Sequence, residues 1–430
     1  MQYLKYRSRK IPDARIVSFS VMFANFSVEW VHHNMANRSA RFSGIHYDLP
    51  RSSPSSLGGP GWIPAGLQKL LLAVVGLFLI PSILFAFVNV NDSSTTSGVL
   101  SHNDHHDSAT GLRHLSQTVQ SATSLSTPTT NLPELIPKYE NVDGTEYVWQ
   151  IPTAPKPKAV LFLAHGCQCR STFFWDRHPQ CLNCTGMPEE RTLVLDALRR
   201  GYAVIAVSST GECWSSQVDT KKVLKVLRNW VPDLSLVGLP VFGLGASSGG
   251  YFISVLAMHF KFQSLVIEIS SGRFEAMDFD STYPPTLFVH MPRDKGLAER
   301  ISEARDLLSE KRVHNDELLC SPLEITDHFF SERIPDVSKE LSEKIVASLH
   351  QYGILVPAHK GLYMKADGRQ SGWTTAVRKG SVLSDDDFVK WERHLQEEMN
   401  LAYAYHEFTS LPSQYIFDWF DSSAPNVDNS

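Results

Sequence analysis

The chain has 430 residues, of which 43% are hydrophobic, so it can bury at least one large core and still carry flanking segments. Its formal net charge of −5 provides no overall basic balance, which argues against nucleic acid as a partner. The sequence contains no internal repeat and no heptad array, and this excludes solenoid and coiled-coil architectures.

The amino-terminal part divides into a basic tail and an apolar run. Residues 1–69 are rich in Lys and Arg and are predicted to form a mostly disordered cytosolic tail. Residues 70–88 carry no charge, and as a helix rising ~1.5 Å per residue they would cross roughly the ~30 Å hydrocarbon layer of a bilayer. We therefore predict one transmembrane helix there, because the alternative, a buried core helix, would normally show a polar face.

Charges on either side of this run indicate its orientation. Lys69 and Arg51 precede it, whereas Asp92 and Asp104 follow it, and positively charged flanks stay in the cytosol. The pattern predicts a single-pass type II protein whose residues 89–430 lie in the lumen of the endoplasmic reticulum or Golgi. Disulfides and N-glycans can form in that compartment.

Two acceptor sequences for N-glycosylation fall in the predicted lumenal part, at Asn91 and Asn183. Asn91 follows the apolar run so closely that the bilayer would shield it. Residues 89–134 are otherwise rich in Ser, Thr and His, bury little apolar surface, and are predicted to be a flexible stalk. Histidines and aspartates within the stalk lack a folded frame, so we predict no metal site there.

Beyond residue 135, short apolar runs alternate with amphipathic helical segments. This alternation is typical of an α/β fold in which a mostly parallel sheet is covered by helices on both faces. We predict one such domain over residues 135–421. Strands are predicted at 159–164, 203–207, 241–244, 265–269 and 286–290, with helices at 188–200, 220–230, 250–260 and 296–311.

The pattern weakens after residue 326. Helices are predicted at 337–352 and 386–405, and residues 327–398 as a whole are expected to form a lid or an accessory helical layer. A short closing helix is predicted at 412–420, followed by a disordered tail over residues 422–430.

A sharp strand-to-helix turn is predicted at Gly245-Ala246-Ser247-Ser248-Gly249. In G-x-S-x-G the central serine is exposed on a strained turn, and small residues two positions away avoid a collision with the adjacent strand and helix. We prefer Ser247 as the nucleophile, although a second frame would place Ser248 there. A dinucleotide-binding loop with Glu268 as its acidic residue is less well matched, because Ser248 occupies the third glycine position. A purely structural turn is the remaining alternative.

Partners for Ser247 occur later in the chain. Asp294 follows the second predicted strand after the turn, where a carboxylate can orient an imidazole, although it is equally suited to cap the next helix. His406 precedes the closing helix and is our preferred base. His328 is its competitor, because a minimal fold would place the histidine there.

A third feature lies at the end of the strand predicted at 159–164, where the chain continues as Ala164-His165-Gly166-Cys167. The backbone N–H groups of Cys167 and Ser248 are predicted to form an oxyanion hole for an acyl-transfer intermediate. The His165 ring is expected to have a structural role.

Together, the His165-Gly166 turn, the Ser247 elbow, Asp294 and a late histidine resemble the α/β-hydrolase superfamily over residues 136–421. The resemblance implies a membrane-anchored serine hydrolase with a Ser-His-Asp triad that acts on an ester or amide of a small molecule or lipid, without a cofactor. Because some relatives in this superfamily have lost catalysis, an inactive domain that binds a ligand or partner protein is the alternative.

Four cysteines, Cys167, Cys169, Cys181 and Cys184, are clustered in one insertion. Disulfides are favoured in a lumenal domain, while a zinc site with His178 is the alternative, and the spacing does not choose the pairing. Cys213 and Cys320 are interpreted as buried and unpaired.

Overall fold

The computed structural model describes residues 133–358, 361–380 and 382–424. The predicted tail over 1–69, the predicted span over 70–88, the stalk up to residue 132 and residues 425–430 lie outside this part. Among the helices that are described, none combines the length and the apolar composition needed to cross a bilayer.

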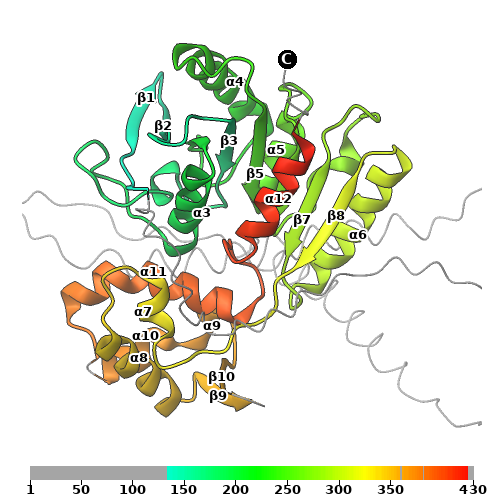
Figure 1. Cartoon of the computed structure of the whole chain (residues 1–430). Coiled ribbons are helices and arrows are strands. Elements are labelled where there is room, and N and C mark those ends of the chain that lie inside the picture. Colours follow the sequence, from blue (N-terminus) through cyan, green and yellow to red (C-terminus); the bar gives the residue numbers. More distant parts are fainter. Residues whose placement is uncertain (1–132, 359–360, 381, 425–430) are drawn as a thin grey trace, which may run out of the picture. The chain divides into compact units, whose positions relative to one another are not determined.

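An eight-stranded sheet forms the centre of the domain (Figure 1). Its strand order is β1-β2-β4-β3-β5-β6-β7-β8, with β3 to β8 parallel and with β1 and β2 antiparallel to their neighbours. The strands are β1 (Lys138–Val142), β2 (Thr145–Gln150), β3 (Ala159–Ala164), β4 (Tyr202–Val207), β5 (Val241–Ala246), β6 (Leu265–Glu268), β7 (Thr286–His290) and β8 (Asn315–Leu319). The five predicted strands correspond to β3 to β7 within two residues at each end.

Burial explains which strands the sequence revealed. Every residue of β3 and β4 is buried, because helices cover both faces of the sheet centre, and such strands appear as continuous apolar runs. Strand β2 and the two edge strands were not predicted. The edge strands have the sequences KYENV in β1 and NDELL in β8. Each contains several polar residues and only a few apolar ones, as expected for strands with one exposed side.

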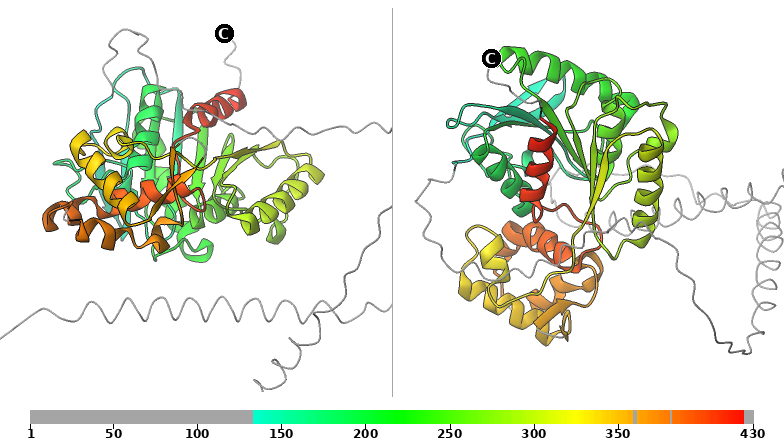
Figure 2. Two further views of the ribbon diagram at one scale, coloured as in Figure 1. Left: turned by 90° about the horizontal axis from the view of Figure 1, so that it is seen from below. Right: turned by 45° about the vertical axis from the view of Figure 1, so that its right-hand side comes forward.

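Helices lie on both faces of the sheet, so the mostly parallel α/β prediction is confirmed. On one face α3 (Pro188–Arg199) lies beside α12 (Ser413–Ser423), and the other face carries α4 (Ser216–Asp233), α5 (Ser248–Leu256) and α6 (Lys295–Glu310) (Figures 1 and 2). Helix α12 continues through Ser423, so the predicted start of the disordered tail at residue 422 is wrong.

Between β8 and α12 the chain builds a second hydrophobic cluster, which we call the cap and define as residues 325–402. Large apolar side chains such as Phe330, Trp373 and Trp391 form its core. The cap contains α7 (Phe329–Arg333), α8 (Lys339–Gln351), β9 (Leu355–Ala358), β10 (Gly361–Met364), α9 (Gly368–Ser371), α10 (Trp373–Lys379) and α11 (Asp385–Tyr403), whose last residue lies just beyond it.

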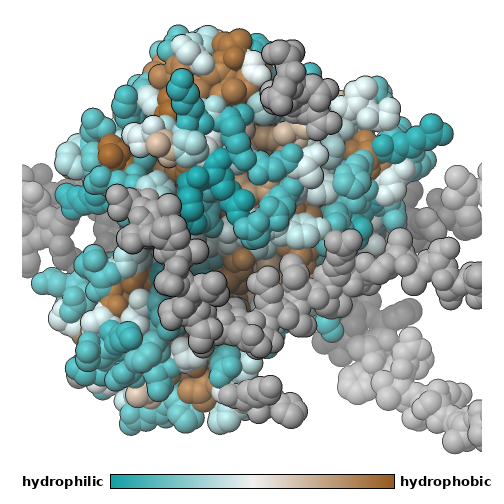
Figure 3. Space-filling view, viewed as in Figure 1, coloured by the Kyte–Doolittle hydropathy of each residue, from teal (hydrophilic) through white to brown (hydrophobic). Residues whose placement is uncertain are grey.

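On the face shown in Figure 3, hydrophilic side chains surround separate apolar patches. The most exposed large apolar side chains are Val389, Val237 and Leu182, at 79%, 71% and 64% exposure. They belong to α11 and to two different loops. Isolated exposed apolar side chains of this kind are ordinary on a globular surface.

Buried carboxyl groups occupy the junction between the cap and the sheet domain. Glu189 and Glu190 begin α3, and Glu397 and Glu398 lie on α11; each is at most 5% exposed. Arg333 of α7 joins the two helices, since its guanidinium pairs with Glu189 at 2.7 Å and also with Glu398. The backbone N–H of Glu189 donates to Glu397 at 3.2 Å. The cap is therefore attached through a polar junction in which two of the four buried carboxyls pair with one guanidinium.

Because buried carboxyls outnumber the guanidinium, the folded protein retains a carboxyl proton. Burial raises the pKa of Glu190 from its ordinary value of 4.5 to about 7, although a hydrogen bond with Glu397 opposes the shift. Burial, followed by the charge of Glu190, also raises the pKa of Glu397. Between pH 4.5 and about 7 the folded protein holds a proton that the unfolded chain releases. The free energy of unfolding contributed by this pair therefore falls as pH rises through that range.

Replacement of Glu397 by Gln should make the domain more stable at alkaline pH. The amide keeps an acceptor for the Glu189 N–H but cannot ionise beside Glu190. We expect the free energy of unfolding to rise by roughly 1–3 kcal/mol at pH 8 and to change little at pH 5, which lies below the raised pKa of Glu190. Urea unfolding followed by circular dichroism at both pH values measures this, with the exposed Glu392→Gln on the same helix as control. A loss of stability at pH 8 would contradict the charge argument.

Candidate active site

Ser247 lies at the tightest turn of the sheet domain, between the end of β5 and the start of α5. Its φ of 52° and ψ of −113° are unusual for a residue with a side chain. A Cβ added to Gly245 would lie closer than 3.0 Å to the carbonyl of Gly249, and one added to Gly249 would collide with the carbonyl of Ala164. Only glycine fits at both positions, so the G-x-S-x-G pattern is required by the approach of β3, β5 and α5.

The side chains of Ser247, His406 and Asp294 form one hydrogen-bonded chain. Ser247 Oγ lies 3.2 Å from His406 Nε2, and His406 Nδ1 lies 2.9 Å from Asp294 Oδ2. Ser247 is half-buried and the His406 side chain is 33% exposed, so both can be reached from outside. Ser248, the alternative nucleophile, has a buried Oγ without a partner in the described part of the chain.

Asp294 has both of the roles that its sequence position suggested. Its Oδ1 accepts the Leu297 N–H at 3.1 Å and caps α6, while its Oδ2 faces the imidazole. Burial acts to raise the pKa of Asp294, but the hydrogen bonds from His406 and Leu297 outweigh it and hold the pKa below its ordinary value. The cap bond thus fixes the carboxylate and keeps it ionised.

His406 reaches the site because α11 ends two residues earlier than predicted, at Tyr403. Ala404 then adopts a left-handed conformation with φ of 57°, which turns the chain toward the sheet. Arg369 of the cap donates to the carbonyl of His406 at 2.8 Å and pairs with Glu407. Sequence analysis did not find this support, because Arg369 is 37 residues away and its segment contains no motif.

The side chains of the two residues in the competing assignments, His328 and Glu268, make no hydrogen bond with Ser247. His328 caps the start of α7 in the cap, where its Nδ1 lies 3.7 Å from Glu343, and it makes no hydrogen bond with Ser247. Glu268, the acidic residue of the dinucleotide alternative, is fully buried and accepts the Thr409 N–H at 3.2 Å. A carboxyl enclosed in this way does not face a ribose.

The turn after β3 faces the nucleophile. A Cβ added to Gly166 would lie 3.8 Å from Ser247 Cβ, so the two segments are in contact range. Within the described residues, the backbone N–H groups of Cys167 and Ser248 donate no hydrogen bond, which leaves both free for a ligand oxygen. His165 beneath this turn is 1% exposed and accepts the Ser209 N–H at its Nε2.

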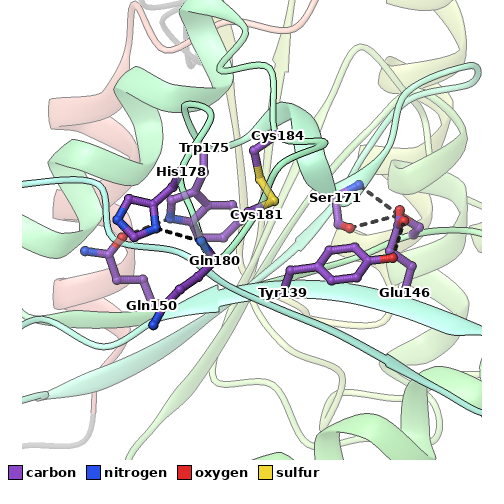
Figure 4. Close-up of a disulfide and its surroundings, with 10 residues drawn as sticks. Tyr139, Glu146, Gln150, Ser171, Trp175, His178, Gln180, Cys181 and Cys184 are labelled. Carbon is purple, nitrogen blue, oxygen red and sulfur yellow. Dashed lines mark hydrogen bonds between the residues drawn. A yellow bond between two sulfur atoms is a disulfide. The ribbon is translucent and has the colours of Figure 1, made fainter.

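The cysteine pairing corrects one prediction. Cys213 is exposed and bonded to Cys167, contrary to its interpretation as buried and unpaired, while Cys181 is bonded to Cys184. Cys169 and Cys320 are free thiols. Figure 4 shows the Cys181–Cys184 bond beside His178, whose Nδ1 accepts the Gln180 N–H at 3.2 Å. Sulfurs joined in these bonds cannot act as thiolate ligands of zinc, so the structure favours disulfides over the metal alternative.

The sheet order, the elbow and the chain order serine, aspartate, histidine are those of the α/β-hydrolase fold. No family model and no curated protein matches the chain. Among solved structures, the chain is similar to a dienelactone hydrolase from Anabaena variabilis at 16% identity, covering 44% of this chain and 87% of that one with a TM-score of 0.33. It is also similar to a carboxyl esterase from Bacillus coagulans at 11% identity, covering 51% and 98% with a TM-score of 0.33.

Replacement of Gly249 by Ala should disrupt the elbow. The new methyl group would meet the backbone carbonyls of Ala164 and His165, which cannot move without separating β3 from α5. We expect the free energy of unfolding to fall by about 2 kcal/mol or more, measured by urea denaturation. Gly296→Ala is the control, because a Cβ there meets only Arg300 Nη1 at 3.6 Å. Equal stability of the two variants would show that the elbow is not tightly packed.

Proposed function

We propose that this protein is a serine hydrolase that cleaves an ester or amide bond through Ser247, His406 and Asp294. The observation that carries the proposal is a single imidazole within hydrogen-bond distance of both a strained, accessible serine and a half-buried carboxylate. No cofactor or metal is needed for this chemistry.

Proton transfer follows from the hydrogen-bond pattern. The carboxylate of Asp294 accepts the Nδ1–H of His406, which leaves Nε2 unprotonated and directed at Ser247 Oγ. Nε2 accepts the hydroxyl proton as Oγ attacks the substrate carbonyl, and it later donates that proton to the leaving group. Asp294 holds the tautomer and stabilises the imidazolium formed in between. Water then enters by the same route and releases the acid from Ser247.

Charge on the carbonyl oxygen would be stabilised by the N–H groups of Cys167 and Ser248. Both are fixed before the reaction, one by the turn after β3 and one by the first turn of α5, whose dipole adds positive potential at this end. Donors that are already oriented need no reorganisation as the oxyanion forms, which is why such sites accelerate acyl transfer.

The substrate is proposed to be a small-molecule or lipid acyl compound. A cavity of about 730 Å³ adjoins the elbow and is lined by Trp214, Ser248, Tyr251 and Phe274 together with Arg273 and Arg300. This volume lies in the range of sites for single small ligands. Aromatic walls suit an apolar acyl group, while the polar remainder can meet its leaving group.

Replacement of Ser247 by Ala should abolish covalent labelling by a fluorophosphonate probe and hydrolysis of p-nitrophenyl esters. Loss of the hydroxyl removes the only atom placed to form the covalent bond, so the rate should fall by roughly a thousandfold or more. Labelling is read by in-gel fluorescence and turnover by absorbance.

Comparison of two histidine variants tests the base in the same assays. His406→Ala should lose activity to a similar extent, whereas His328→Ala should retain it, because His328 faces Glu343 in the cap. A wild-type protein that is folded but never labelled would favour the alternative of an inactive ligand-binding domain.

We further propose that residues 89–430 face the lumen of a secretory-pathway membrane, anchored by residues 70–88. Two features support an oxidising compartment: the bonds Cys167–Cys213 and Cys181–Cys184. Asn183, the acceptor in the second sequon, is exposed and therefore accessible to the glycosylation machinery.

Expression of the full chain in cultured eukaryotic cells should give a glycosylated protein. Treatment with peptide N-glycosidase should increase its mobility on a gel by the equivalent of one glycan, and Asn183→Gln should remove that shift. Thr185→Ser keeps the sequon and serves as the matched control. An unshifted wild-type band would contradict the lumenal orientation.

A further inference from the structure

We propose that the Cys167–Cys213 disulfide positions the oxyanion hole, so that Cys213, which touches no substrate atom, helps set the rate of the chemical step. This inference rests on the proposed function, because it concerns the donor Cys167 N–H. The bond joins the turn after β3 to the loop over residues 208–215 that follows β4, across 46 residues of sequence.

Sheet geometry makes this link possible. Strands β3 and β4 are parallel neighbours, with Ala164 paired to Val207, so their following loops leave the sheet at the same edge. The Cα atoms of Cys167 and Cys213 lie 4.3 Å apart. Beside the disulfide, the Gln168 N–H donates to the carbonyl of Glu212 at 2.6 Å. The residue that carries the oxyanion donor and the one after it are thus both tied to the β4 loop.

His165 connects the base of the turn to the same loop. Its Nδ1–H donates to the Gly166 carbonyl at 2.6 Å, and its Nε2 accepts the Ser209 N–H at 3.0 Å. Burial lowers the pKa of His165 to about 4, so the ring stays neutral and keeps one donor and one acceptor over the physiological range. Its ring therefore acts as a spacer between the two segments, in agreement with the structural role expected from the sequence.

Trp214 extends the link to the second oxyanion donor. Its Nε1–H donates to the His165 carbonyl at 2.9 Å, and its ring stacks on Phe252 of α5 with centroids 4.1 Å apart. Helix α5 begins at Ser248, whose N–H is the other donor. The loop over residues 208–215 is therefore linked to both donors of the oxyanion hole. Cys213 links it to Cys167, and Trp214 links it to helix α5, which begins at Ser248.

The turn needs such support because its own conformation is unfavourable. Gln168 has a φ of 62°, a left-handed conformation that is unfavourable for a residue with a side chain. Cys167 and Gln168 are both exposed, so burial does not hold them in place. What holds them is the disulfide, the hydrogen bond to Glu212 and a turn hydrogen bond from the Cys169 N–H to the Gly166 carbonyl at 3.4 Å. Without the disulfide we expect the turn to sample other conformations in which the Cys167 N–H no longer points at the reacting carbonyl.

The second disulfide offers a matched comparison. Cys181 and Cys184 are three residues apart, and their bond closes a small local turn in the loop that precedes α3 (Figure 4). None of the links from the turn after β3 to the loop over residues 208–215 involves the Cys181–Cys184 bond. Its removal changes the local chain without loosening the segment that carries the Cys167 N–H.

A double-mutant cycle tests the proposal in purified full-length protein. Cys167→Ala keeps the backbone N–H and removes only the tie, as does Cys213→Ala. Each single variant and the double variant should therefore show the same loss in kcat, roughly tenfold to a hundredfold, with KM within about twofold of the wild type. An oxyanion donor acts mainly in the transition state, which is why kcat and not KM should change.

Reduction gives an independent measurement. Dithiothreitol transfers two electrons and two protons to the Cys167–Cys213 bond, giving two thiols, and closes to its own cyclic disulfide. It should lower kcat of the wild type to the level of the double variant and leave that variant unchanged. The control variant Cys181→Ser/Cys184→Ser should keep wild-type kcat before reduction and lose it afterwards.

The outcomes separate this proposal from the proposed function. Absence of fluorophosphonate labelling in the oxidised wild type would remove the hydrolase itself. Normal labelling with unchanged kcat in all three cycle variants would overturn only the positioning role. Additive losses in the cycle, or a loss in KM alone, would likewise contradict it, because the two cysteines would then act separately or on binding. Thermal unfolding of each variant identifies a loss of kcat that arises from unfolding.

Discussion

The contact between the ends of β3 and β5 and the start of α5 is the constraint on which the site depends. Gly245 and Gly249 have no side chain, so backbone meets backbone where any Cβ would collide. That approach forces Ser247 into its strained conformation and exposes its Oγ at the end of β5. It also brings Gly166, at the end of β3, into contact range of Ser247. One packing requirement therefore places both the proposed nucleophile and half of the proposed oxyanion hole.

This location agrees with the order of the strands. β3 lies between β4 and β5, so the chain leaves β3 in one direction for β4 and then crosses to the other side for β5. At such a reversal the loops diverge and leave a crevice at the carboxyl ends of the strands, where open α/β sheets bind ligands. Ser247 and Cys167 follow the two strands that flank that crevice. Asp294 and His406 then enter from β7 and from beyond the cap.

The parts of the fold that the sequence revealed are those whose burial leaves a local signature. Continuous apolar runs predicted β3 to β7, and small residues around Ser247 predicted the elbow. Edge strands β1 and β8 carry mixed polar residues and so left no such signal. The Cys213 pairing was missed for another reason: it depends on two loops that meet only after β3 and β4 pair. The same holds for Glu397 and Arg333, whose burial comes from contacts between the cap and α3. No window of neighbouring residues contains that information.

The cap holds the segment that carries His406. Arg369 on α9 holds the carbonyl of His406, and Asn400 on α11 donates to Glu407 at 2.6 Å, the residue that follows the imidazole. On the other side of the triad segment, Ser410 donates its N–H to Glu189 of α3 at 2.7 Å. The short stretch that carries His406 is therefore hydrogen-bonded to the cap on one side and to the sheet domain on the other. The buried glutamates lie at the junction between these two parts. A change in how the cap packs would therefore shift this stretch, and with it the distance from the His406 imidazole to Ser247.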